Sequence, residues 1–268
     1  MSMTLPRNVR IARAEVAPLL GQAGSCPASA AVEITPLPLD VDPASVRALT
    51  DLLSTDEMER ANRFVFERDR RRFIVGRSGL RQLLAARLGV QPQAIEFTYG
   101  PRGKPALGPR FSGSDLRFNL SHSGGLAVVA LAAGRELGVD VEEVRALPDA
   151  TDVAARFFSR RENEAYLGLE ARDRPQGFFN CWTRKEAFIK AIGDGLYHPL
   201  DSFDVSLAPG EPAKILRVEG KSGDHCGWRM EGFSPAPGFV GAVVIECERR
   251  QPGLASASPR LVHPATTP

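Results

Sequence analysis

Two acidic residues, Asp140 and Glu142, stand two positions apart within the segment 138–142, Gly-Val-Asp-Val-Glu. Because side chains in a β-strand alternate between its two faces, both carboxylates are expected on the same face. Two like charges placed in this way repel each other unless a cation lies between them, and hard divalent cations prefer oxygen ligands. The spacing therefore indicates a metal site, with an acidic strand end that faces solvent as the alternative.

A second group of chemically capable residues lies in the segment 182–190, Trp-Thr-Arg-Lys-Glu-Ala-Phe-Ile-Lys. Its apolar residues recur at helical spacing, and Glu186 and Lys190 lie four positions apart on the flank of that apolar stripe, where they would adjoin a cleft. Lys185 falls within the stripe, so its ammonium group must reach the surface or meet a buried anion. The alternative for Glu186 and Lys190 is an ordinary ion pair on a helix surface.

Ser121 and His122 belong to the segment 118–125, Phe-Asn-Leu-Ser-His-Ser-Gly-Gly, which precedes an apolar strand. A hydroxyl, an imidazole and the exposed backbone N–H groups of a glycine turn suit phosphate oxygens. A serine nucleophile with a histidine base is disfavoured, because adjacent residues in a strand or turn do not normally reach each other in those roles. The segment therefore predicts a phosphate-binding turn.

Basic residues supply the remaining candidates. The turn 102–105, Arg-Gly-Lys-Pro, presents Arg102 and Lys104 on a rigid frame. Arg68 and Arg72 lie one helical turn apart in an Arg-rich segment, where they could share one anionic ligand. The 34 Lys and Arg residues include only five Lys, and a compact ammonium charge suits a phosphate group. Three of the five Lys fall in the segments described so far: Lys104, Lys185 and Lys190.

The elements that position these residues belong to a chain of ordinary globular composition, 268 residues long, 43% hydrophobic and 25% charged. Its formal net charge of +2 provides no field that would attract a nucleic acid or a membrane surface. The four cysteines are scattered without metal-binding spacing, which favours a reducing compartment, the cytoplasm. The longest apolar run, 126–133, is too short to cross a bilayer.

The sequence also contains a weak internal repeat. A shift of 115 residues places Phe-Ile at 73–74 on Phe-Ile at 188–189, and Ala-Val-Val at 127–129 on Ala-Val-Val at 242–244. We therefore predict an α+β fold of two similar halves, related by a pseudo-twofold axis, with a ligand cleft between them. The expected segments are a loosely ordered leader (1–31), an N-terminal half (32–134), a C-terminal half with the metal motifs (135–248) and a disordered tail (249–268).

Both halves contain similar secondary-structure signals. The pattern Ser-x-x-Glu of a capping box opens a helix at Ser54 and again at Ser159. Helical and strand-like patterns follow, the former at 67–88 and 175–192 and the latter at 126–132, 137–142 and 239–246.

Together, these motifs and their order resemble the Sfp-type 4′-phosphopantetheinyl transferases. The resemblance extends from about residue 47 to about residue 206, and the paired signatures Gly-x-Asp-x-Glu and Trp-x-x-Lys-Glu-Ala-x-x-Lys are specific. The matching residues are Arg68-Asp69 with Gly76, Gly-Lys-Pro at 103–105, Phe-Asn-Leu-Ser-His-Ser at 118–123, the segments 138–142 and 182–190, and Arg-Phe-Phe-Ser at 156–159.

The resemblance implies an enzyme that transfers the 4′-phosphopantetheine moiety of coenzyme A to a serine hydroxyl of an apo acyl or peptidyl carrier protein. It also implies dependence on Mg²⁺ and release of adenosine 3′,5′-bisphosphate. Members of the family consist of two similar α+β halves with coenzyme A in the cleft between them. We expect a cytoplasmic monomer that serves fatty acid, polyketide or nonribosomal peptide biosynthesis.

Roles for individual residues follow from the same resemblance. Asp140, Glu142 and Glu186 would hold Mg²⁺, and Glu186 would also act as general base on the serine hydroxyl. Lys190 would stabilise the departing phosphate. The full set implied to contact coenzyme A is Arg68, Arg72, Arg102, Lys104, Ser121, His122 and Lys190.

The segment 156–159 is expected to present Phe157 or Phe158 to the carrier protein. Two other classes of function compete with a transferase: a non-catalytic module that binds coenzyme A or a nucleotide, and an Arg-rich protein that binds nucleic acid. The first would need a lost carboxylate, and none is missing. The second would need aromatic residues interleaved with the arginines, and these are few. A Walker-type phosphate loop is absent from the sequence, and no nucleic acid or membrane partner is expected.

Overall fold

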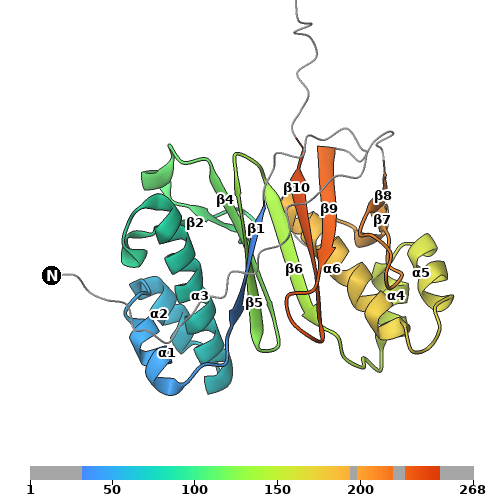
Figure 1. Cartoon of the computed structure of the whole chain (residues 1–268), viewed down its shortest axis with the longest axis horizontal. Coiled ribbons are helices and arrows are strands. Elements are labelled where there is room, and N and C mark those ends of the chain that lie inside the picture. The colour runs from blue at the N-terminus through green and yellow to red at the C-terminus, as the bar shows by residue number, and fades with distance from the viewer. Residues whose placement is uncertain (1–31, 194–197, 220–226, 248–268) are drawn as a thin grey trace, which may run out of the picture.

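The computed structural model describes residues 32–193, 198–219 and 227–247, and these residues form two halves of the same design (Figure 1). In each half the chain runs through a strand, two short helices, a long helix, a short hairpin and a long hairpin. The predicted leader and the predicted tail lie outside the described residues.

The first half contains β1 (Glu33–Pro38), α1 (Pro43–Thr50), α2 (Thr55–Asn62), α3 (Glu67–Leu88), β2 (Phe97–Tyr99), β3 (Pro105–Leu107), β4 (Leu116–Ser123) and β5 (Leu126–Ala133). The second half contains β6 (Leu137–Glu143), α4 (Ala150–Phe157), α5 (Arg160–Leu167), α6 (Arg174–Ile192), β7 (Phe203–Val205), β8 (Ile215–Val218), β9 (Trp228–Phe233) and β10 (Phe239–Glu246). Short 3-10 turns lie at Pro92–Ala94, Pro109–Phe111 and Leu200–Ser202. None of the helices described is long and apolar enough to span a membrane.

Each half is built on a three-stranded antiparallel sheet. The strand order is β1-β5-β4 in the first sheet and β6-β10-β9 in the second. Figure 1 shows the two sheets face to face at the centre, with α1–α3 on the outer side of the first sheet and α4–α6 on the outer side of the second. The prediction of an α+β fold with two similar halves is therefore confirmed.

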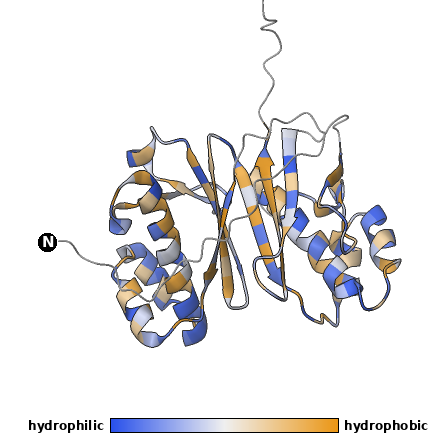
Figure 2. Ribbon diagram, in the orientation of Figure 1, coloured by the Kyte–Doolittle hydropathy of each residue, from blue (hydrophilic) through white to orange (hydrophobic). Residues whose placement is uncertain are grey.

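The middle strands of the two sheets, β5 and β10, are apolar on both faces, and Figure 2 colours β10 largely orange. Along β5, Ala127 and Val129 pack with the helices of the first half, whereas Val128 and Ala130 pack with the second sheet. Burial of one valine side chain contributes roughly 1.5–3 kcal/mol, so this central layer holds the two halves together. Its members from the second sheet include Val139, Val141 and Val243.

The sequence located most of these elements, but the uniform shift of 115 residues is wrong for the long helices. The capping boxes at Ser54 and Ser159 occupy the same place in the two halves. A shift of 115 would pair Phe73, in the first half of α3, with Phe188, in the second half of α6. The shift in residue number that relates the two halves is smaller at the helices than at the last strands. The reason is that the connections between the later elements are longer in the second half.

Candidate active site

The site begins at a seam where β4 of the first half lies beside β6 of the second. Alternate side chains of β4 reach across to β6 and form the hydrogen bonds between the two strands. Ser121 Oγ donates to Asp140 Oδ1 at 2.7 Å, and Ser123 Oγ donates to Glu142 Oε2 at 2.5 Å. On the same face of β4, Asn119 Oδ1 accepts the backbone N–H of Val139 at 2.9 Å. The segment predicted as a phosphate-binding turn is therefore mostly strand, since β4 extends to Ser123 and only 124–125 turn. It lies directly against the acidic motif.

Helix α6 approaches the same strand unusually closely, and Gly138 permits this. A Cβ atom at position 138 would lie 2.2 Å from the backbone oxygen of Ala187 and 2.3 Å from the backbone nitrogen of Ala191. Such distances exclude any side chain unless the helix or the strand shifts. The glycine of the Gly-x-Asp-x-Glu signature thus lets α6 lie on β6, which brings Glu186 and Lys190 to the two carboxylates.

These elements enclose an open cavity of about 700 Å³. All six residues predicted from the motifs 118–125, 138–142 and 182–190 to bind the coenzyme or the metal line it: Ser121, His122, Asp140, Glu142, Glu186 and Lys190. They come from three motifs that are far apart in the chain and belong to both halves. The cavity therefore collects every predicted metal ligand and the predicted base.

Lys190 is the cation at the centre of this group. Its Nζ atom lies 2.6 Å from Asp140 Oδ1, 3.1 Å from Ser121 Oγ and 3.3 Å from the backbone oxygen of Val139. The Asp140 carboxylate is buried, and the lysine side chain is 28% exposed, so the pair lies at the cavity wall and not on an outer surface. The lysine predicted to handle phosphate is held in the cavity by Asp140.

Glu186 occupies a different electrostatic position. Burial raises the pKa of the Glu186 carboxyl to about 6, the Lys190 charge opposes the rise, and the charges of Asp140 and Glu142 add to it. The side chain is half-buried and lines the cavity. Three carboxylates thus share one cavity with Lys190 and Arg156, and Arg145 lies 3.5 Å from Glu142. A divalent cation between the carboxylates would lower their mutual repulsion further.

The carboxylate oxygens of the cavity are the candidate ligands for the predicted metal. As they stand, no three His, Cys, Asp or Glu side chains among the described residues are arranged around a metal position. Asp140 Oδ2, however, is buried and has no hydrogen-bond partner in the part of the chain that the structure describes. Mg²⁺ keeps several waters and takes only one or two carboxylates, so an unpartnered oxygen next to Glu142 and Glu186 fits this ion.

His122 lines the cavity, and partial burial, followed by the charge of Lys190, lowers the pKa of its ring. Arg72 does not line the cavity; its Nε and Nη2 atoms donate to the two carboxylate oxygens of Asp40, each at 2.7 Å. Its guanidinium lies near Gly125, in the turn that follows His122. Arg68 is exposed and pairs with its neighbour Asp69 at 3.2 Å.

The predicted turn 102–105 also lies outside the cavity lining. Lys104 Nζ binds Glu136 Oε2 at 3.1 Å and the backbone oxygen of Leu137 at 3.0 Å, which ties this turn to the start of β6. Arg102 is exposed in the same turn. The structure therefore places three of the seven predicted coenzyme contacts in the cavity and the other four outside its lining. The coenzyme roles of all seven remain predictions.

Lys185 corrects one expectation. It was grouped with the lysines whose charge suits phosphate, but its side chain is fully buried. Its ammonium group contacts Glu162 Oε2 at 2.7 Å and two backbone oxygens, of Leu200 at 2.6 Å and Phe203 at 2.7 Å. The buried anion required by its place in the apolar stripe is Glu162, and Lys185 has no access to a ligand in the cavity.

Arg156 and Phe157, from the segment expected to meet the carrier protein, form one wall of the cavity with Trp182. The turn 198–201, His-Pro-Leu-Asp, forms another wall and was missed by sequence reasoning. The turn has no charge pattern or spacing that could have identified it. Phe157 lies edge-to-face on Trp182, with ring centroids 6.0 Å apart, whereas Phe158 is in the core at 3% exposure. Of the two phenylalanines, only Phe157 reaches the cavity.

Comparisons with known proteins agree with this geometry. The sequence model of the 4′-phosphopantetheinyl transferase superfamily matches residues 136–243, and the model of a 4′-phosphopantetheinyl transferase N-terminal region matches residues 42–134. The 4′-phosphopantetheinyl transferase HetI of Nostoc sp. is 44% identical over 80% of this chain and 87% of its own length. The 4′-phosphopantetheinyl transferase Sfp of Bacillus subtilis is 32% identical over 71% of this chain and 81% of its own length.

Proposed function

The chain belongs to the 4′-phosphopantetheinyl transferase superfamily, and from this premise we propose that the cavity between β4, β6 and α6 is its catalytic centre. The protein is an enzyme of this type, which transfers phosphopantetheine from coenzyme A to a carrier protein. The observation that carries the proposal is the convergence of Asp140, Glu142, Glu186, Lys190, Ser121 and His122 on one cavity.

The proposal assigns Mg²⁺ to the acidic cluster of Asp140, Glu142 and Glu186. Because Mg²⁺ takes only one or two carboxylates, Asp140 and Glu142 are its main ligands and Glu186 is left to act as the base. When bound, the ion supplies positive charge to the diphosphate of coenzyme A, which would otherwise repel an anionic nucleophile. The support for this assignment is the unpartnered, buried Asp140 Oδ2 and the presence of two more carboxylates on the same cavity. We assign the ion to Mg²⁺ because oxygen ligands beside substrate phosphates suit it.

Side chains of the protein accept the proton of the carrier serine and stabilise the negative charge of the departing phosphate. Glu186 accepts the proton of the carrier serine, directly or through a water, as that hydroxyl attacks the phosphorus atom next to phosphopantetheine. Lys190 places its ammonium group beside the phosphate that departs as adenosine 3′,5′-bisphosphate. Ser121 and His122 provide donors to the phosphate oxygens from β4.

The carrier protein is assigned to the wall formed by Arg156, Phe157 and Trp182. Phe157 is half-buried and stacked edge-to-face on Trp182, so a partner at this wall meets an aromatic surface that is already fixed in place. We propose that the enzyme works as a monomer in the cytoplasm. Its scattered cysteines support a reducing compartment.

The direct test is the intact mass of purified apo carrier proteins after incubation with the enzyme, coenzyme A and Mg²⁺. We expect one phosphopantetheine group on the carrier serine, and no gain when a chelator removes the metal. A serine-to-alanine carrier is the matched control. Absence of any mass gain across fatty acid, polyketide and nonribosomal peptide carriers would contradict the proposed substrate.

Asp140→Ala tests the metal assignment separately. We expect the Mg²⁺ concentration for half-maximal transfer to rise tenfold or more, on the order of the losses that follow damage to metal sites. The measurement is the initial transfer rate across a Mg²⁺ titration. Asp152→Ala, at an exposed position of α4, is the control and should leave the titration unchanged. If the midpoint of the Mg²⁺ titration is unaltered in Asp140→Ala, this carboxylate is not a ligand of the metal.

A further inference from the structure

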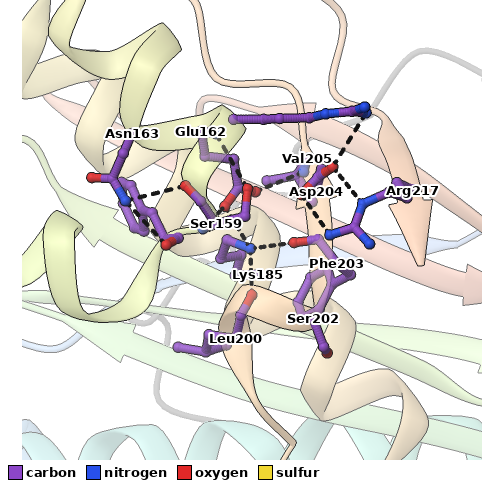
Figure 3. A network of polar contacts seen from close by, with 12 residues as sticks. Ser159, Glu162, Asn163, Lys185, Leu200, Ser202, Phe203, Asp204, Val205 and Arg217 are labelled. Carbon is purple, nitrogen blue, oxygen red and sulfur yellow. Dashed lines mark hydrogen bonds and ion pairs between the residues drawn. The ribbon is translucent and has the colours of Figure 1, made fainter. Parts of the chain in front are cut away.

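Lys185 lies at the centre of a polar network inside the second half. Figure 3 shows its ammonium group between Glu162 on one side and the backbone oxygens of Leu200 and Phe203 on the other. The three contacts of 2.6–2.7 Å use all three donors of the ammonium group. Lys185 also lies over the ring of Phe203, 4.2 Å from its centroid. The residue therefore has one defined position.

Glu162 connects this lysine to two further segments. Its Oε2 accepts the backbone N–H of Ser159 at 2.7 Å, which closes the capping box of α5. Its Oε1 accepts the backbone N–H of Val205, in β7, also at 2.7 Å. The next residue along the chain is Asn163, whose Nδ2 donates to the backbone oxygens of Ala154 and Phe158 and so fixes the end of α4 against α5.

These segments are the walls of the cavity. Leu200 lines it directly, and Phe157 lines it at the end of α4, where Asn163 holds the backbone. Lys185 precedes Glu186 on α6, so the same helix turn that carries the proposed base is bonded to one wall and, through Glu162, tied to the other. We propose that the Lys185–Glu162 pair is a positioning device that sets Glu186 and Lys190 relative to the cavity walls. This inference rests on the proposed function of the cavity.

The first half contains the same device without a catalytic site. Arg81 Nε binds Glu57 Oε2 at 2.7 Å, and Glu57 belongs to the capping box of α2. Arg81 Nη1 donates to the backbone oxygens of Pro92 at 2.8 Å and Ile95 at 3.0 Å. As in the second half, these oxygens belong to the first residue of a 3-10 turn and to the residue that follows it. This turn does not line the cavity.

Comparison of the two ion pairs therefore separates an effect on the stability of the fold from an effect on the positions of Glu186 and Lys190. A buried ion pair gains little net stability over apolar residues of similar size, but removal of one partner leaves an uncompensated buried charge. Lys185→Met should for this reason lower the melting temperature by roughly 10 °C. Arg81→Met should lower it by less, because Glu57 keeps an ion pair with Arg77 at 3.1 Å. Only the first change frees a wall of the cavity.

The experiment compares these two variants well below both melting temperatures, with the folded fraction measured by circular dichroism. We expect Lys185→Met to lower kcat about tenfold or more per folded molecule, since small misplacements of reacting groups are costly. Arg81→Met should retain the kcat of the unchanged enzyme. Sucrose, which favours the folded state, should restore the melting temperature of both variants without restoring kcat in Lys185→Met.

Equal kcat for Lys185→Met and Arg81→Met, or full recovery in sucrose, would overturn the positioning role. If Lys185→Met does not fold, Lys185→Met with Glu162→Gln removes both buried charges and is compared in its place; a kcat equal to that of Arg81→Met then rejects the proposal. A different result is expected if the cavity is not the catalytic site. In that case Glu186→Gln would retain transfer, whatever the outcome at Lys185.

Discussion

Glu186→Gln is expected to reduce transfer about 10³-fold or more while leaving the fold intact. Glu186 is half-buried on the cavity, one residue after the anchored Lys185, and is proposed to accept the serine proton. Glutamine keeps the shape and volume of the side chain but cannot accept a proton at neutral pH, and the loss of a positioned base typically costs 10²–10⁴-fold. The measurement is the single-turnover rate of carrier modification at saturating coenzyme A.

The same variant separates the two roles assigned to Glu186. If the carboxylate serves only as a metal ligand, additional Mg²⁺ should restore much of the rate, because ligand loss weakens binding and higher concentration compensates for it. If the carboxylate is the base, the rate at saturating Mg²⁺ should stay low. We expect the second result.

Glu164→Gln is the matched control for this variant. Glu164 lies on α5 with a side chain that is 64% exposed, and it pairs only with Arg160 among the ion pairs described for it. Surface pairs of this kind contribute little, so both stability and transfer should be unchanged. Full activity in Glu186→Gln, with the fold verified by its melting temperature, would remove Glu186 from the mechanism.

Local sequence signals predicted much of the fold. The capping boxes at Ser54 and Ser159 both form, and the helix predicted at 67–88 has those bounds in the structure. These features depend on residues that lie close together in the chain, so a short stretch of sequence is enough to predict them. The alternation in 138–142 likewise predicted which carboxylates share a face.

Long-range contacts could not be predicted in the same way. The position of Lys185 in an apolar stripe required a partner, yet Glu162 already had a local role in its capping box. That one carboxylate serves both the box and Lys185 depends on how α5 packs against α6. The cavity wall at Leu200 arises for the same reason, because its backbone oxygen is held by Lys185 and not by a pattern of its own side chains.

Comparison of the halves explains why the described residues contain one proposed centre and not two. Both halves have a long helix anchored by a buried cation to a capping-box glutamate. Only β6 has two carboxylates on one face, and only α6 carries a glutamate directly after its anchored cation; the residue after Arg81 in α3 is Gln82. The first half instead contributes β4, with its hydroxyls and imidazole, to the shared seam.

Lys190→Met is expected to lower kcat by about 10²–10³-fold, the range seen when one preorganised donor to a developing charge is removed. Methionine is unbranched and of similar length, so the packing of α6 should be retained. The change removes the ammonium group that lies 2.6 Å from Asp140 and 3.1 Å from Ser121. Because this charge is proposed to favour the departing phosphate, kcat should fall more than the affinity for coenzyme A, which calorimetry measures independently.

Lys214→Met provides the control, since Lys214 is an exposed lysine far along the chain from both motifs and should be silent in both measurements. Lys190→Arg sharpens the test. It restores the charge but replaces a compact ammonium group with a wider planar one that does not fit the space between Ser121 and Asp140 in the same way. We therefore expect only partial recovery of kcat. Loss of coenzyme affinity with an unchanged kcat in Lys190→Met would instead assign Lys190 to ground-state binding, and the departing phosphate would need another cation.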